Sequence, residues 1–155
     1  MVWPLVIDYQ EYPINRHGSH GELSSMRPVI DIRHEGMIIK ALVDSGADRS
    51  VSFKQVGEVL GLDFTHDRSV VSNLYGLHRC DREGCELNPL CLKTYEKPLS
   101  FSVGDKQVVL PISWIERKFN VETDFMLILG RDFFSYFDIL FKQRDEQFAL
   151  FPHEA

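Results

Sequence analysis

One short segment of the sequence combines residue types that can carry out acid–base chemistry. A mostly apolar run, residues 39–43, ends at Asp44, and Ser45 and Gly46 follow it. An apolar strand holds such a carboxylate on a rigid element, and a glycine beside it lets backbone, a second carboxylate or a substrate approach closely. Asp-Ser-Gly is also a common turn tripeptide. Taken alone, the segment therefore fits either a turn or a catalytic carboxylate.

A second segment favours the catalytic interpretation. The apolar run 125–129 is followed by Gly130, Arg131 and Asp132, where the pattern predicts that a strand ends and a helix begins. The two motifs in this order, Asp-Ser-Gly-Ala-Asp and then Ile-Leu-Gly-Arg-Asp-Phe, resemble the retropepsin-like aspartic proteases, which are single-domain relatives of pepsin best known from retroviruses. The resemblance covers roughly residues 28–151, with an insertion at about 78–98.

The resemblance implies a role for each residue of the first motif. Asp44 is expected to be the catalytic carboxylate. Ser45 is expected to brace the active-site loop through hydrogen bonds to a partner subunit, and Ala47 supports the same loop. Gly46 is expected to bond the backbone of the substrate.

The resemblance also assigns Asp48 to substrate binding and to an ion pair with Arg131. A desolvated guanidinium beside a buried strand needs a carboxylate partner, which favours this pair. The alternative is that Arg131 is a solvated residue at the start of a helix.

Peptide hydrolysis by this route requires two carboxylates that share one proton, one acting as general base toward water and the other as general acid toward the scissile carbonyl. Two like charges about 3 Å apart cannot both ionise, which is established for aspartic-protease dyads. The chain has one Asp-Ser-Gly and no internal repeat of it. We therefore expect a homodimer with Asp44 from each subunit, in which the terminal segments Leu5–Ile7 and Phe148–Phe151 pair across the interface.

The hairpin around Ser69–His78 is expected to form the flap over an extended peptide substrate. Tyr75 and Gly76 lie near its tip and are candidate substrate-binding residues. This flap departs from the glycine-rich retroviral pattern, because Gly76 is its only glycine. Tyr75 could equally pack at a strand end with its hydroxyl bonded.

The three cysteines lie close together, in the insertion. His78, Cys80, Cys85 and Cys91 could supply the four ligands of a structural zinc ion, but their spacing lacks the Cys-x-x-Cys knuckle. Reduced cysteines without a metal are the preferred interpretation, and a disulfide competes only in an oxidising compartment. We therefore expect no cofactor.

Composition places these motifs in a single soluble domain. The chain has 155 residues and a formal charge of −6, and the acidic excess argues against a nucleic-acid partner. The N-terminus lacks the basic region of a signal peptide, and no apolar stretch is long enough to span a bilayer. The expected location is the cytoplasm, with no membrane partner.

The elements that must position these residues are short strands. Hydrophobic runs on each side of a Glu35-Gly36 turn predict a hairpin over residues 29–43, and helical spacing predicts a helix over residues 54–60. Further hairpins are expected at residues 99–114 and 139–151, with a short helix over residues 133–137 between them. Trp114 either lines a substrate subsite or fills the core.

The sequence therefore predicts a mainly β fold, a retropepsin-like closed β-barrel with one or two short helices, active as a two-fold dimer. The expected organisation is an N-terminal strand and flexible arm over residues 1–27, a protease domain over 28–151 and a tail over 152–155. The expected function is an aspartic endopeptidase in which Asp44 of two subunits activates a water. The alternative is a dimeric peptide-binding module with this fold that does not cut, and that zinc could brace.

Overall fold

The computed structural model describes residues 2–14, 23–71, 93–119, 121 and 125–154 of the chain. These residues form short strands with one short α-helix and two 3-10 helices. In chain order the elements are β1 (Leu5–Asp8), β2 (Gln10–Ile14), β3 (Leu23–Arg27), β4 (Val29–His34), β5 (Met37–Val43), β6 (Ser50–Phe53), α1 (Lys54–Val59), β7 (Val70–Val71), β8 (Lys93–Val103), β9 (Lys106–Ile115), β10 (Leu127–Leu129), η3 (Phe133–Ser135), β11 (Phe137–Lys142), η4 (Gln143–Asp145) and β12 (Gln147–Pro152).

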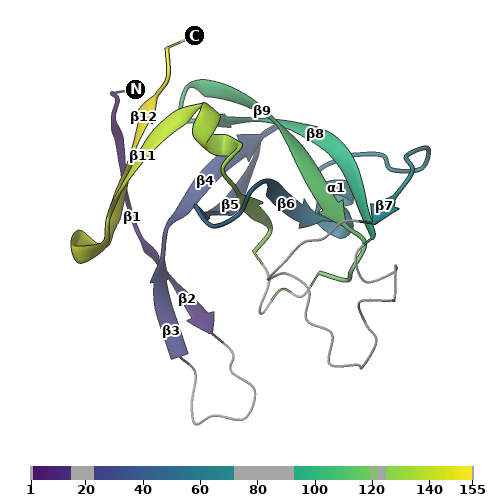
Figure 1. Cartoon of the computed structure of the whole chain (residues 1–155), viewed down its shortest axis with the longest axis horizontal. Coiled ribbons are helices and arrows are strands. Elements are labelled where there is room, and N and C mark those ends of the chain that lie inside the picture. Colours follow the sequence, from purple (N-terminus) through teal and green to yellow (C-terminus); the bar gives the residue numbers. More distant parts are fainter. Residues whose placement is uncertain (1, 15–22, 72–92, 120, 122–124, 155) are drawn as a thin grey trace.

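The centre of the molecule is a closed barrel of six strands (Figure 1). Its order is β4-β5-β10-β6-β9-β8, and pairing of Arg33 on β4 with Ser102 on β8 closes the ring. The short strand β10 is parallel to β5 and antiparallel to β6. The prediction of a mainly β, closed-barrel fold is confirmed.

The barrel encloses the hydrophobic core, to which most of the strands contribute alternate side chains. In β4, for example, Ile30 and Ile32 point inward and Asp31 outward, as a half-buried strand requires. All of β10 is buried, as its continuous apolar run predicts. Trp114 has no exposed surface, and its indole nitrogen donates to the carbonyl of Lys97 at 2.9 Å, so it fills the core.

Of two predicted local elements, the turn at Glu35-Gly36 is confirmed and the helix over residues 133–137 is shorter than expected. Glu35 and Gly36 both have positive φ, 45° and 82°, which is the backbone that a two-residue hairpin turn needs. The helix expected over residues 133–137 is only the 3-10 turn η3. Phe137 instead begins β11, where it pairs with Pro152 and its side chain is fully buried.

The two ends of the chain meet in a separate sheet of order β1-β12-β11 (Figure 1). Leu5 and Ile139 both lie opposite Leu150. The terminal segments that were expected to pair between two subunits thus pair within one chain, because this register gathers their apolar side chains on the inner face of the sheet.

The N-terminal segment, which was expected to form a flexible arm after its first strand, contains a pair of strands. Strands β2 and β3 pair antiparallel from Gln10 opposite Arg27 to Ile14 opposite Leu23. Pro13 and the polar residues around it hid this hairpin in the sequence. The predicted domain boundaries stay predictions.

No helix in the described part of the chain is both long enough and apolar enough to cross a bilayer.

Candidate active site

Asp44 lies where β5 ends beside β10. Its backbone N–H donates to the carbonyl of Leu129 at 2.9 Å, and its carbonyl accepts from the N–H of Ala47 at 3.2 Å. The carboxylate is oriented by the loop that follows, because Oδ1 accepts the N–H of Gly46 at 2.9 Å. A Cβ at Gly46 would lie 3.2 Å from the same oxygen, so glycine gives this oxygen and the backbone room to approach.

The half-buried Asp44 and the exposed Ser45 line a hollow of about 390 Å³. Its other walls come from distant parts of the chain, including Tyr9 and Arg27 before the barrel and Phe141 after it. Burial raises the pKa of the Tyr9 phenol above its usual range. The sequence did not indicate these walls, because residues so far apart in the chain come together only in the fold.

Asp48 and Arg131 are in contact, Nη2 of the arginine with Oδ1 of the aspartate. The Arg131 backbone also donates to the carbonyl of Ala47 at 2.8 Å. Both paired side chains are largely exposed, 62% for Arg131 and 80% for Asp48. The expectation that Arg131 is desolvated is therefore wrong. Solvent screens its ion pair with Asp48.

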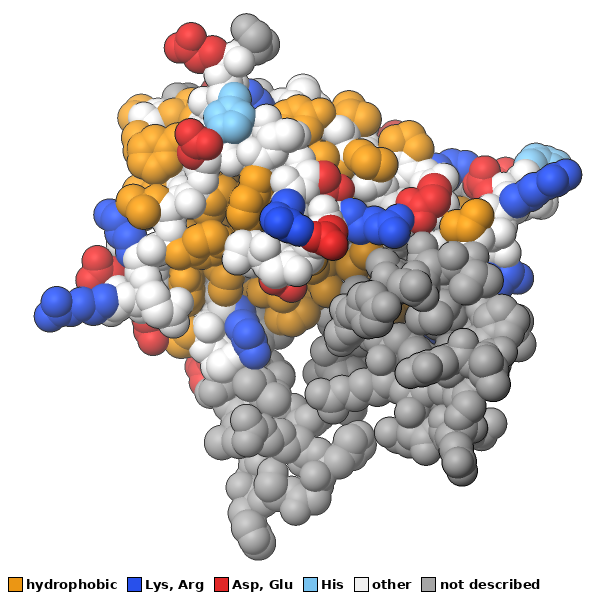
Figure 2. All heavy atoms as spheres, viewed as in Figure 1, with side chains coloured by type: hydrophobic (Ala, Val, Ile, Leu, Met, Phe, Trp, Pro, Cys, Tyr) orange, Lys and Arg blue, Asp and Glu red, His pale blue; other side chains and the backbone are white. Residues whose placement is uncertain are grey.

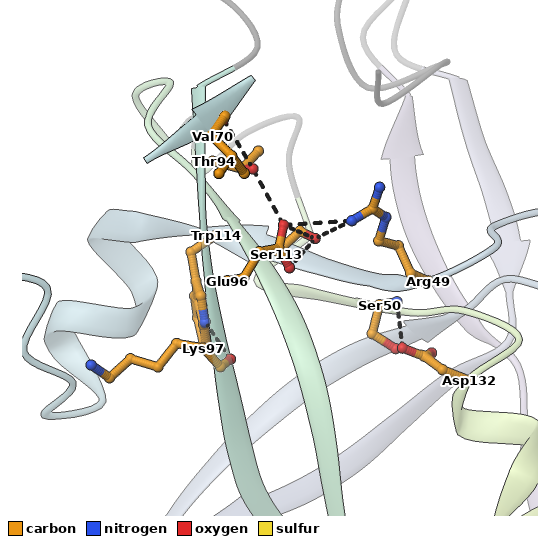
Figure 3. Close-up of polar contacts among 9 residues, drawn as sticks. All are labelled: Arg49, Ser50, Val70, Thr94, Glu96, Lys97, Ser113, Trp114 and Asp132. Atoms are coloured by element: carbon orange, nitrogen blue, oxygen red, sulfur yellow. Dashed lines mark hydrogen bonds and ion pairs between the residues drawn. The ribbon is translucent and has the colours of Figure 1, made fainter. Parts of the chain in front are cut away.

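A buried network that the sequence did not reveal fixes the far end of the same loop (Figure 3). Ser50 is fully buried, and its Oγ donates to Oδ1 of Asp132 at 2.6 Å and accepts from the N–H of Gly130 at 3.0 Å. The Ser50 backbone N–H donates to Oδ2 of Asp132 at 3.0 Å. The only signal in the sequence was a serine at the start of a short strand that also contains Ser52.

Gly130 sits between the two ends of this loop. A Cβ there would lie 2.5 Å from the carbonyl carbon and oxygen of Arg49 and 2.8 Å from the carbonyl oxygen of Ala47. Only glycine allows β10 to approach the loop this closely, which explains its place in the second motif.

Several predicted site residues lie outside the described residues. These are the flap residues Tyr75 and Gly76 and the zinc candidates His78, Cys80, Cys85 and Cys91. Within the described ranges, no group of three or more His, Cys, Asp or Glu side chains is arranged to hold a metal ion.

The described residues thus form a closed barrel with an aspartate loop between β5 and β6, and a Gly-Arg-Asp turn braces this loop. No family model matches the sequence. No curated protein matches it either.

Solved structures identify the fold directly. A retropepsin-like aspartic protease from Rickettsia conorii aligns over 97% of this chain and 96% of its own, with a TM-score of 0.57 and 18% identity. Two further matches are the retroviral protease-like domain of Ddi1 from Leishmania major, with 16% identity over 76% of this chain and 82% of its own and a TM-score of 0.47, and the EIAV protease in complex with the inhibitor HBY-793, with 16% identity over 79% and 92% and a TM-score of 0.46. The match to the Rickettsia conorii structure shows that the chain has the retropepsin-like fold that its two motifs predicted.

Proposed function

We propose that this chain is an aspartic endopeptidase whose active site forms between two copies, each contributing Asp44. The observation that carries the proposal is the placement of Asp44. Within a retropepsin-like fold, its carboxylate lies at the edge of a hollow and is oriented by the N–H of Gly46.

In the proposed mechanism the two Asp44 carboxylates share one proton. The ionised carboxylate takes a proton from a water, whose oxygen attacks the carbonyl carbon of the scissile peptide bond, and the protonated carboxyl gives its proton to the carbonyl oxygen. The tetrahedral intermediate then collapses: the C–N bond breaks, the leaving nitrogen takes the proton that the first carboxylate had removed from water, and a hydroxyl of the intermediate returns a proton to the second carboxylate. The apparent pKa values would belong to the pair and not to one residue.

Homodimerisation is proposed because one chain supplies one Asp-Ser-Gly. Strands β1 and β11 are the outer strands of the terminal sheet, and their free edges can pair with a second copy. Val6 and Leu140 both lie opposite Ala149 and are half exposed, so an apolar strip runs across the outer face of this sheet. Apolar side chains gather on this side of the molecule in Figure 2.

The remaining site residues keep their proposed roles. Ser45 is exposed and available to brace the loop against the partner's copy of it. Gly46 and Asp48 are also exposed, as binding of a substrate backbone requires, and Arg131 orients Asp48. Tyr75 and Gly76 are proposed as flap residues, and a cytoplasmic location likewise stays a proposal.

Digestion of a peptide library tests the proposal. Wild-type protein should cut between about pH 4 and 7 and be blocked by a pepstatin-type inhibitor. Asp44→Asn should lower cleavage by about 10²–10⁴-fold, the usual contribution of a general acid–base group, while leaving folding and dimerisation intact. Asp31→Asn is the matched control, because Asp31 is an exposed carboxylate that bonds Lys40 on the barrel surface.

Two results would contradict the proposal. One is a protein that remains monomeric at micromolar concentration in sedimentation and still cuts. The other is a wild-type protein that dimerises and binds peptides but cuts none of them, which would favour a peptide-binding module.

A further inference from the structure

A polar cluster joins Arg49, at the end of the active-site loop, to residues of β8 and β9, two strands that the proposed mechanism does not use. Arg49 Nη1 lies 3.5 Å from Oε1 of Glu96 and donates to Oγ of Ser113 at 3.2 Å (Figure 3). The Ser113 hydroxyl is within 2.8 and 2.9 Å of the two Glu96 oxygens, and the hydroxyl of Thr94 is 3.3 Å from Oε1. Ser113 and Thr94 are fully buried and form the floor of the cluster.

The two charged members of the cluster differ in what they can still bind. The Glu96 carboxylate already accepts from two hydroxyls and the guanidinium. Among the described residues, the polar contacts of Arg49 all use Nη1, although a guanidinium carries five N–H donors. The second terminal nitrogen points away from Ser113 and Glu96 in Figure 3. The N–H groups of Arg49 other than those on Nη1 can therefore still donate to an acceptor such as a carboxylate.

The ion pair between Arg49 and Glu96 is weak enough to exchange a partner. The two side chains are 47% and 41% exposed, and the distance between their nearest atoms is at the long end for an ion pair. Exposed pairs contribute little to stability. Ser113 would keep Nη1 in place while the rest of the guanidinium bonds another carboxylate.

Strand register gives the distance from Arg49 to the catalytic position. Val43 lies opposite Leu129, so Asp44 flanks Gly130 on one side. On the other side, Val51 lies opposite Ile128 in an antiparallel pair. Continued by two residues, this register places Arg49 beside Gly130, and the close approach of the Gly130 and Arg49 backbones agrees with it. Neighbouring strands are about 4.8 Å apart, so the backbones of Asp44 and Arg49 are about 10 Å apart.

An extended peptide advances about 3.3 Å per residue, so this distance corresponds to about three residues of substrate. We propose that Arg49 selects an acidic side chain, Asp or Glu, two to three residues from the scissile bond. Ser113 acts as the positioning residue that holds Nη1 in place, and Glu96 is the carboxylate with which the acidic side chain of the substrate competes. The inference rests on the proposed peptidase function and names its substrate class.

A symmetric dimer makes the inference more specific. Each subunit presents one Arg49, so the two guanidinium groups lie on opposite sides of the dyad. Acidic residues should therefore be enriched both before and after the cleaved bond, at similar distances from it.

The first experiment is digestion of a random-sequence peptide library, with cleavage positions read by mass spectrometry. Wild type should show enrichment of Asp and Glu at the second or third position on both sides of the cut. A matched pair of synthetic substrates, differing only by Glu or Gln at the enriched position, should differ about tenfold in kcat/KM, mainly through KM, as expected for one charge-assisted hydrogen bond.

Variants then assign the effect to Arg49. Arg49→Ala should remove the difference between the two substrates, and Arg49→Glu should reverse it toward a Lys-containing substrate. Glu96→Gln should retain or increase the preference, because it removes a competing carboxylate. Arg33→Ala is the control and should leave the ratio unchanged, because Arg33 is an exposed arginine that pairs with Ile38 near the opposite end of β5.

The outcomes separate this inference from the proposed function. Cleavage by wild type without acidic enrichment, or a preference that survives Arg49→Ala, overturns the inference and leaves the peptidase function standing. If wild type cuts nothing, two peptide pools that differ only in carrying Glu or Gln are compared by fluorescence anisotropy. A tenfold difference in Kd that Arg49→Ala abolishes supports Arg49 as an acid-binding residue, and equal Kd values overturn it.

Discussion

Replacing Ser50 with alanine removes the hydroxyl that ties the far end of the active-site loop to the Gly-Arg-Asp turn. The hydroxyl donates to the Asp132 carboxylate at 2.6 Å and accepts from the Gly130 N–H at 3.0 Å. A hydrogen bond to a charged group contributes about 1.5–3 kcal/mol, and a buried donor left without an acceptor costs about 1–3 kcal/mol. Both terms apply at a fully buried site, and the charge of Asp132 stays bonded to the Ser50 N–H.

The two terms together give an expected loss in free energy of unfolding for Ser50→Ala of about 2.5–6 kcal/mol, measured by urea denaturation monitored by circular dichroism. Ser100→Ala, at an exposed position of β8, is the matched control and should change stability by less than about 0.5 kcal/mol. Asp132→Asn gives the second arm of a double-mutant cycle, and its coupling with Ser50→Ala should exceed about 1 kcal/mol. A loss below about 0.5 kcal/mol for Ser50→Ala, or additive effects in the cycle, would refute the assignment of this network as the support of the loop.

Three further predictions follow from single positions. Gly130→Ala should lower the stability by about 3 kcal/mol or more, because the added Cβ would meet backbone atoms at 2.5 Å; a melting temperature equal to that of wild type would contradict it. The pKa of His153 is raised above its usual range, first by its hydrogen bond to Asp138 and then by the carbonyl of Ser135. The stabilisation from this contact is therefore complete below the pKa of His153 in the unfolded chain and is lost as pH rises through its pKa in the folded chain. An NMR titration in which Asp138→Asn leaves the His153 pKa unchanged would refute the cause. Trp114→Phe should cost about 2 kcal/mol in urea denaturation, because it leaves a gap in the core and a buried carbonyl of β8 without its donor; an unchanged midpoint would contradict it.

The sequence predicted those elements whose causes are local. The hairpin of β4 and β5 follows from the alternation of apolar residues and from a turn at Glu35-Gly36 that needs positive φ at both positions. The burial of β10 follows from its composition alone. By contrast, the hairpin of β2 and β3 was missed, because local signals such as Pro13 argue against a strand and only its pairing stabilises it.

In the candidate site, too, the sequence predicted the residues that are adjacent in the chain and missed the contacts between residues far apart in it. Asp44 and its neighbours were recognisable because a strand, a carboxylate and a glycine are adjacent in the chain. The bond between Ser50 and Asp132 joins residues 82 positions apart, and neither residue type is unusual where it stands. The cluster of Arg49 with Glu96 joins residues 47 positions apart on two strands whose order in the barrel the sequence does not specify.

One short strand explains why the two motifs are informative together and weak apart. β10 bonds the backbone of Asp44 through Leu129 on one side, and the residues that follow it, Gly130 and Asp132, hold Ser50 on the other. The loop between these two anchors carries both the proposed catalytic carboxylate and the proposed selecting guanidinium. A loop fixed at both ends loses little conformational freedom when a substrate binds, so it can hold its groups in a productive geometry. We therefore expect variants of Ser50 and Asp132 to lower cleavage and to blur the acidic preference together, whereas Arg49→Ala should change the preference while cleavage of neutral substrates continues.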